Sequence, residues 1–320
     1  MSKIIELTKE MICKQVASGK IEFIGKPFEK VQKFYYATNE NIRGYMNLYN
    51  MHNKKIATVM GSCDHPLNAC FNGATTIDTF DTNFLTKYYG LGIKISAILK
   101  YNYHEYLDFL KKIVSDNISP KQLQNIITSL LPYMESEEKQ FWKEISQYNT
   151  FIQSHSQRPL NLFKMLSVNI ISIDELTKKN SYLLNEANYN KLKRLLSHTK
   201  INFTNCDCLD LPTQLKKQYD MIFLSNIPDY FYNNPEFGYF WKYKKLQEVE
   251  HQFDKILRPN GLLFLDYMYL YYSHTSKKPR TNQIVNSSIK YSDLTNETYS
   301  IFPSLKSSNV DDGVLVYSKR

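Results

Sequence analysis

The chain has 320 residues, of which 42% are hydrophobic and 22% are charged, and its formal net charge is +9. This balance is ordinary for a globular protein with a full core, and it argues against a fibrous or disordered chain. No apolar run approaches the roughly 18 residues that a membrane-spanning helix needs. The five cysteines include no Cys-x-x-Cys pair, which argues against a disulfide framework or a metal site and predicts a cytoplasmic protein.

The positive charge does not identify a partner by itself. Nucleic acid, anionic lipid and acidic substrates would all fit a net charge of +9. Many of the lysines occur together with Asn, Ile and Tyr, a mixture that AT-rich coding sequence produces. A nucleic-acid partner is therefore left open but not favoured, and the sequence leaves the oligomeric state open as well.

The first 53 residues predict a helical N-terminal cap. Ile4, Leu7 and Met11 recur at helical spacing. The aromatic-rich stretch 27–49 is interpreted as helical too. Its aromatic side chains either pack between helices or cover a ligand pocket.

Residues 54–100 predict a strand, a glycine turn, a short helix, a second strand and a further helix. Residues 56–60 are apolar and β-branched, as a buried parallel strand should be, and Gly61 follows at once. The second strand, at 75–80, leads into Asp81, which follows Gly61 by 20 residues. This is the separation of a nucleotide-binding unit, in which glycine lets the ligand approach the backbone and the acid accepts hydrogen bonds from the ribose.

The following region, up to residue 195, has helical periodicity and no convincing strand. A helix is expected over 84–110, although Gly90 and Gly92 each cost about 1 kcal/mol of helix propensity. These glycines predict either a close approach by another backbone or a break in the helix. Residues 101–195 are interpreted as a helical insertion, which either packs as decoration or builds the acceptor side of a site.

The α/β pattern resumes at residue 196 and continues to the C-terminus. Strands are expected at 201–205, 220–225 and 262–267, and an antiparallel closing pair at 298–302 and 313–318. An amphipathic helix over 244–257 is expected to end at Arg258-Pro259-Asn260-Gly261, which combines two helix breakers.

The order of these motifs resembles that of class I S-adenosylmethionine-dependent methyltransferases. The likeness covers about residues 54–99 and 201–320, and its most specific part pairs Tyr219-Asp220-Met221-Ile222 with the later Leu257-Arg258-Pro259-Asn260-Gly261. It implies a Rossmann-like sheet with an antiparallel last strand, formed by residues 54–100 and 196–320. The first turn departs from the family pattern, because it has one glycine where the family usually has two or three.

The resemblance also implies S-adenosylmethionine as the cofactor and assigns residues to it. Asp81 would hold the ribose, Asp207 would lie near the adenine, and Gly61 would lie under the methionine part. The other candidate cofactor-binding residues belong to the same turns: Ser62, Cys63, Thr82, Asn83, Cys208, Ser225 and Asn226. Asp229 is the candidate base and Tyr230 a candidate positioning group, because both follow the fourth strand, where the acceptor would lie.

The leading hypothesis is a transferase, most simply a methyltransferase, acting on a small molecule, lipid or peptide. A weaker likeness, carried by Phe80-Asp81-Thr82-Asn83 and the position of the insertion, is to 3-amino-3-carboxypropyl transferases that use the same donor. A third hypothesis is a non-catalytic binding protein that keeps the fold, which the single glycine of the first turn favours.

Overall fold

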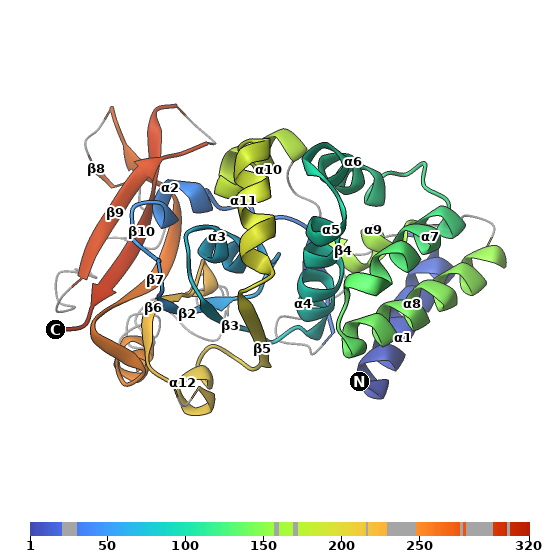
Figure 1. Cartoon of the computed structure of the whole chain (residues 1–320), viewed down its shortest axis with the longest axis horizontal. Helices are drawn as coiled ribbons and strands as arrows, with labels where there is room; N and C mark the ends of the chain where they lie inside the picture. Colours follow the sequence, from blue (N-terminus) through green and yellow to red (C-terminus); the bar gives the residue numbers. More distant parts are fainter. Residues whose placement is uncertain are drawn as a thin grey trace.

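The computed structural model describes residues 1–20, 31–156, 160–168, 172–215, 217–228, 248–275, 278–279, 297–305 and 308–320. Figure 1 shows two adjoining parts, with a twisted sheet and its helices on one side and a group of helices on the other. The N-terminus lies in the helical part and the C-terminus at the far edge of the sheet.

Seven strands form the main sheet in the order β5-β3-β2-β6-β7-β10-β9, and β8 pairs with β7 off this path. Strands β5, β3, β2, β6 and β7 are parallel, whereas β10 runs antiparallel to both of its neighbours. The strands are β2 (Lys55–Val59), β3 (Thr76–Asp81), β5 (Lys200–Asn205), β6 (Tyr219–Phe223), β7 (Leu257–Ser273), β8 (Lys278–Pro279), β9 (Glu297–Pro303) and β10 (Val310–Ser318).

Numbered in chain order from β2 and leaving β8 aside, the seven strands read 3-2-1-4-5-7-6, and the seventh is the antiparallel one. The first five positions follow the doubly wound order of parallel strands, in which the strand order reverses between the first and fourth strands. Every predicted strand has a counterpart, and the main difference in length is β7, which runs over Leu257–Ser273 where a strand was expected at 262–267. The predicted α/β fold with an antiparallel last strand is confirmed.

The sheet buries both of its faces, because successive residues of its strands point to opposite sides. Ile222 and Leu263 belong to a core that also contains Val249 and Phe253 from the helical residues 248–254. Phe223 and Phe264 stack on the other face, with ring centroids 4.1 Å apart, and belong to a larger core that extends into the helical part.

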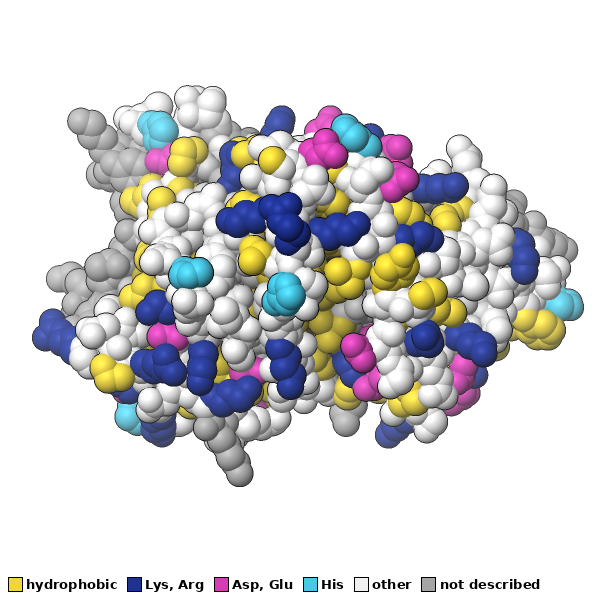
Figure 2. Space-filling view, viewed as in Figure 1, with side chains coloured by type: hydrophobic (Ala, Val, Ile, Leu, Met, Phe, Trp, Pro, Cys, Tyr) yellow, Lys and Arg dark blue, Asp and Glu magenta, His cyan; other side chains and the backbone are white. Residues whose placement is uncertain are grey.

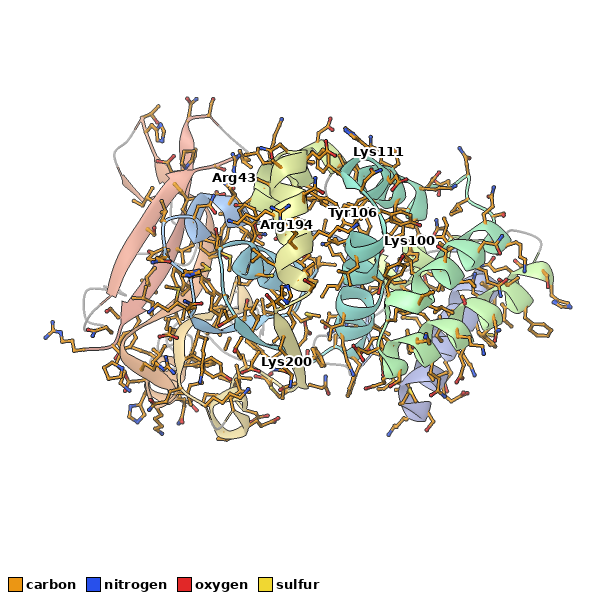
Figure 3. All side chains as sticks on the ribbon, in the orientation of Figure 1. Arg43, Lys100, Tyr106, Lys111, Arg194 and Lys200 are labelled. Carbon is orange, nitrogen blue, oxygen red and sulfur yellow. The ribbon has the colours of Figure 1, made fainter. Side chains whose placement is uncertain are left out.

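Helices on this second side link the sheet to the helical part. Helix α3 (Asp64–Phe71) packs against α11 (Glu186–Leu196), as Figure 1 shows beside the sheet. In Figure 3 Tyr106 of α6 lies between α11 and α5, and its ring centroid is 5.4 Å from that of Tyr189. The remaining short elements here are α2 (Ile42–Met46), α10 (Ile173–Lys179) and η3 (Ser181–Leu183), whereas α12 (Leu211–Gln214) contributes Leu211 to the core on the other face.

The helical part combines the N-terminal helix with the segment between β3 and β5. Helix α1 (Ser2–Ser18) packs along α8 (Ser136–Ser154), and the Gln15 amide donates to the Met165 carbonyl at 2.9 Å. The other elements are α4 (Phe84–Lys87), the π-helix η1 (Tyr88–Lys94), α5 (Ile95–Lys100), α6 (Tyr103–Ile113), α7 (Pro120–Leu130), η2 (Leu131–Tyr133) and α9 (Leu162–Leu166).

Several predicted elements differ from the observed ones. The described part of 27–49 is not a continuous helix: it holds the two-residue strand β1 (Phe34–Tyr35) and the short α2. Strand β1 pairs with β4 (Ser167–Val168), which lies in the region where no strand was expected. The prediction failed because both strands are too short to show a period of two.

Two predicted helix boundaries are also wrong. The expected helix over 84–110 ends early, because Tyr101 and Asn102 separate α5 from α6, whereas the break that Gly90 and Gly92 suggested is present as η1. The helix expected to reach residue 257 ends at 254, and β7 begins at Leu257. The breakers at 258–261 instead form an irregular strand entry, where Asn260 has a φ of 61° and the pairing with β6 shifts register.

The excess of basic side chains lies on the surface. Figure 2 shows Lys and Arg spread over the face that carries α11, and Figure 3 places Arg194 of α11, Arg43 of α2 and Lys100 of α5 across it. In the described part of the chain, no helix is long and apolar enough to span a membrane.

Candidate functional site

A cavity of about 280 Å³ lies at the carboxyl ends of β5, β3, β2 and β6. In an open parallel sheet this end, near the point where strand order reverses, is where ligands bind. One wall consists of the turns that follow the strands. The opposite wall consists of residues 32–35 and 38–40, together with Val168 of β4.

Most of the predicted cofactor-binding residues meet at this cavity. Its lining includes Gly61, Ser62, Asp81, Thr82, Asn83, Asp207, Cys208, Ser225 and Asn226. Cys63 does not line it and is buried beneath the turn, next to Gly90. Asp229 and Tyr230 lie outside the described residues, so their roles stay predictions.

The turn after β2 has an unusual backbone. Gly61 has a φ of 45° and Cys63 a φ of 68°, and the Cys63 N–H donates to the Met60 carbonyl at 2.6 Å. A Cβ at Gly61 would meet no protein atom within 4 Å, so glycine is favoured there by its φ rather than by crowding. Cys63 is not glycine, and such a conformation persists only where the surroundings enforce it.

Asp81 at the tip of β3 is held by backbone donors. The Gly61 N–H donates to Oδ2 and the Asn83 N–H to Oδ1, both at 3.0 Å. Burial raises the pKa of Asp81 to about 6, although these hydrogen bonds favour the carboxylate and act in the opposite direction. The same hydrogen bonds fix the carboxylate at the cavity wall, beside the glycine turn.

The Asn83 side chain has a structural task. Its Oδ1 accepts from the N–H groups of Leu85 and Gln32, and its Nδ2 donates to the Gln32 carbonyl at 2.9 Å. It therefore caps α4 and holds one end of residues 32–40 against the tip of β3. Asn83 could therefore contact a ligand only through atoms that do not take part in these hydrogen bonds.

The turn after β5 places Asp207 between two cavity-lining cysteines, Cys206 and Cys208. Asp207 Oδ1 accepts from the Leu209 N–H at 2.9 Å, which orders the turn. Burial raises the pKa of the Cys206 thiol to about 12, so this thiol is neutral at physiological pH. Within the described residues, no group of three or more His, Cys, Asp or Glu side chains could hold a metal ion.

Sequence reasoning missed a polar cluster at the other end of the cavity. Glu40 accepts from the Ser225 hydroxyl, and its Oε2 lies 3.1 Å from Nε2 of His65. The same His65 nitrogen lies 2.8 Å from the Tyr45 hydroxyl. Ser225, like Cys63, has a positive φ, here 62°. The tips of β2 and β6 are thus both followed by a strained turn residue, and the one after β6, Ser225, belongs to this cluster.

A second missed network lies under the turn after β2. Asp64 Oδ1 accepts from Lys94 Nζ at 2.7 Å and from the Tyr182 hydroxyl at 2.8 Å. Its Oδ2 accepts from the Ser62 hydroxyl and from the Thr38 N–H, both at 2.8 Å. Lys94 Nζ also donates to the Ser62 carbonyl at 2.9 Å. The Asp64 carboxylate therefore links four parts of the chain. These are the turn after β2, the stretch 32–40, the π-helix η1 and the segment that contains Tyr182.

No local signal marks these residues in the sequence. Glu40 and His65 are 25 positions apart, and Asp64 and Tyr182 are 118 apart. Such pairs become visible only once the chain is folded. The helical pattern around Lys94 did place this residue on a helix, but a lysine there is normally expected to face solvent.

No protein-family model and no curated protein matches the sequence. A search of solved structures finds chains that are similar to this one at low TM-scores and low sequence identity. One is an rRNA methylase from Streptococcus thermophilus, at 5% identity and a TM-score of 0.32, covering 85% of this chain and 90% of that one. Another is the magnesium protoporphyrin IX methyltransferase of Synechocystis PCC 6803 with bound SAH, at 8% identity and a TM-score of 0.32, covering 99% and 86%.

A third is a putative methyltransferase complexed with SAH, at 11% identity and a TM-score of 0.34, covering 87% of this chain and 47% of that one. Scores this low assign neither a reaction nor a ligand. The strand order and direction define the class: the chain has the Rossmann-like fold of class I methyltransferases.

Proposed function

We propose that this protein is an S-adenosylmethionine-dependent transferase, most simply a methyltransferase acting on a small molecule, lipid or peptide. The observation that carries the proposal is the cavity over four strand ends, with Asp81 at the tip of β3 and Asp207 after β5. The resemblance assigns the ribose to Asp81 and the adenine to Asp207, and the fact that both acids line one cavity supports the proposal.

The strand order supports one orientation of the donor. A ligand with its adenine beside Asp207 and its ribose at Asp81 has its methionine part over β2 and β6. Gly61 and Ser62 would then lie under the methionine part, and Ser225 and Asn226 would lie beside the carbon to be transferred. Thr82 and Cys208 would line the ribose and adenine ends.

Positioning supplies most of the catalysis in such a reaction. The sulfonium activates the carbon, so the enzyme must hold an acceptor in line at roughly 3–3.5 Å. Residues of the stretch 32–40 would cover the donor on the side away from the strand ends. The acceptor would then lie in the region beyond Asn226. Asp229 and Tyr230 follow directly in the chain and keep their proposed roles as base and positioning group.

The second candidate is transfer of the 3-amino-3-carboxypropyl group from the same donor. It is favoured by the helical segment between β3 and β5, which follows Phe80-Asp81-Thr82-Asn83 as in the transferases that the sequence resembles. Both reactions would use the same cavity, and they differ in which carbon–sulfur bond of the donor faces the acceptor.

The test is incubation of the protein with labelled donor and a cell extract, followed by analysis of product and by-product. Methyl transfer releases S-adenosylhomocysteine, whereas transfer of the larger group releases methylthioadenosine. An Asp81→Ala variant serves as the control, because it should abolish either reaction. Donor binding with no modified acceptor in any extract would favour the non-catalytic binding protein instead.

A further inference from the structure

The cavity is acidic, although the protein as a whole is basic. Its described lining holds three acids, Glu40, Asp81 and Asp207, against one lysine, Lys33, and one histidine, His65. The complete chain has a net charge of +9. A recessed site lined by one sign of charge concentrates the field and favours ligands of the opposite sign. This lining therefore fits a ligand that carries positive charge.

Glu40 is the acid with the most unusual surroundings. Its side chain is 2% exposed, and its partners are the Ser225 hydroxyl and the His65 imidazole. Within the described part of the chain, no lysine or arginine forms an ion pair with it. The Lys179 ammonium donates to the carbonyl of Asn39, the residue before Glu40, at 3.1 Å. A buried carboxylate is costly unless a cation or several hydrogen bonds compensate it.

The neighbouring tyrosines respond to this charge. Burial raises the pKa of Tyr45 well above its ordinary range, and the negative charge of Glu40 raises it further. Tyr267 donates to Asp312 at 2.6 Å, and burial, Asp312 and then Glu40 all raise its pKa. Both phenols therefore stay neutral and add no second negative charge beside Glu40. Apart from His65, which is charged only when protonated, the partners of Glu40 named above carry no positive charge, and Glu40 lines the cavity.

The position of Glu40 follows from the strand order. Its hydroxyl partner, Ser225, follows the tip of β6, and its imidazole partner, His65, is in the first turn of the helix after β2. Glu40 thus lies between the tips of β2 and β6, two strands away from the end of β5. A donor with its ribose at Asp81 has its sulfur in this region, whereas Lys33 is near the opposite end, next to Gln32 and Asn83.

We propose that the Glu40 carboxylate is the countercharge for the sulfonium of the bound donor, so that the site prefers a cationic ligand over its neutral product. The inference rests on the proposed function. In the transfer, the acceptor's lone pair forms the new bond to carbon, the carbon–sulfur bond breaks, and its electron pair stays on sulfur. The acceptor gains the positive charge and then loses a proton to the base, for which Asp229 is the candidate. The neutral thioether then loses its attraction to Glu40, which favours product release.

The test compares two ligands by calorimetry. S-adenosylhomocysteine has a neutral thioether, and sinefungin has an ammonium-bearing carbon at the sulfonium position, while both keep the adenosine and amino-acid parts. We expect the wild-type protein to bind sinefungin about tenfold more tightly or better. Glu40→Gln keeps the shape and removes the charge, so it should reduce this preference by about tenfold, mainly through weaker sinefungin binding.

Glu138→Gln is the matched control. Glu138 is also a buried glutamate, but it pairs with Lys87 at 3.3 Å and does not line the cavity. This variant should leave the preference unchanged. An equal loss of both ligands in Glu40→Gln, or an unchanged ratio, overturns the proposal.

If Glu40→Gln does not fold, the affinities of the wild-type protein for sinefungin and S-adenosylhomocysteine are enough to test the proposal. Equal affinity of the wild-type protein for both ligands contradicts the countercharge while leaving the proposed function intact. Failure of both ligands to bind contradicts the proposed function itself, so the two failures are distinguishable.

Discussion

At Asp81, burial and hydrogen bonding act on one carboxylate in opposite directions. Burial is the larger effect, because the pKa rises to about 6 despite two backbone donors. A raised pKa means that the folded state binds the proton more tightly than the unfolded state. The contribution of Asp81 to the free energy of unfolding therefore falls as pH rises from about 4 to about 6. We interpret this loss of stability as a consequence of keeping a carboxylate buried at the cavity, where it can bind a ligand.

The first prediction is a pH dependence of donor binding. Ribose hydroxyls donate to the ionised carboxylate, and a group with a pKa of about 6 is only about one-tenth ionised at pH 5. The affinity for S-adenosylhomocysteine should therefore fall about tenfold between pH 7.5 and pH 5, measured by calorimetry. Asp81→Asn should bind weakly at both values. An affinity of the wild-type protein that does not change with pH would remove Asp81 from the ribose site.

Lys94 and Asp64 present a different case at the residue scale, because their charges are paired inside the core. Both side chains are 0% exposed, and Asp64 accepts four hydrogen bonds, one of them from Lys94. Removing one member of such a pair leaves an uncompensated charge, whereas removing both charges can be nearly neutral.

The second prediction follows from this asymmetry. Lys94→Met should lower the free energy of unfolding by about 3–5 kcal/mol, measured by urea denaturation. The double variant with Asp64→Asn should recover part of the loss, because no isolated charge then remains. A Lys94→Met protein as stable as the wild type would show that the pair does not stabilise the fold.

At the scale of elements, the π-helix η1 explains the two glycines that sequence reasoning singled out. A Cβ at Gly90 would lie 2.5 Å from Met60 Cε and 2.9 Å from Cys63 Cβ. One at Gly92 would lie 2.8 Å from Nε1 of Trp142, whose indole donates to the Tyr88 carbonyl at 2.7 Å. The expected interruption is confirmed, but side chains approach more closely than another backbone does.

The third prediction concerns Gly92→Ala. The added methyl group meets a rigid indole ring, so Trp142 must shift and its hydrogen bond to Tyr88 must lengthen. We expect a loss of about 1–3 kcal/mol in the free energy of unfolding. The fluorescence of Trp142 should change with it. Lys111→Ala, at an exposed position in the last turn of α6, serves as the control and should change neither quantity appreciably.

The main sheet could be predicted because its strands contain buried apolar runs. Apolar β-branched runs such as 56–60, each next to a turn signal, have few alternative structures. The wall at residues 32–40 could not be predicted, because its hydrogen bonds are to distant residues: Thr38 to Asp64, Tyr36 to Leu110 and Asn41 to Tyr267. The acids at strand tips were visible by spacing, whereas Glu40 was not.

At the scale of the whole molecule, the cavity joins the two parts seen in Figure 1. The sheet contributes the strand tips, and the helical segment after β3 contributes Val168 to the lining and Tyr182 to Asp64. The larger core likewise runs from the sheet into the helices without interruption. The helical segment is therefore part of the wall of the site, whether or not it also contacts the acceptor.

The last prediction tests this coupling. A ligand that binds only the folded state at 100 times its dissociation constant adds about 2.7 kcal/mol of stability, which for a chain of 320 residues corresponds to a rise of roughly 4 °C in Tm. Trp142 reports on the helical part, and the other tryptophan, Trp241, can be replaced by phenylalanine. Because both parts build the cavity, S-adenosylhomocysteine should shift the Trp142 fluorescence transition and the far-ultraviolet circular dichroism transition equally. Asp81→Ala should show neither shift. If the ligand moved only the dichroism transition, the helical part would unfold independently of the site.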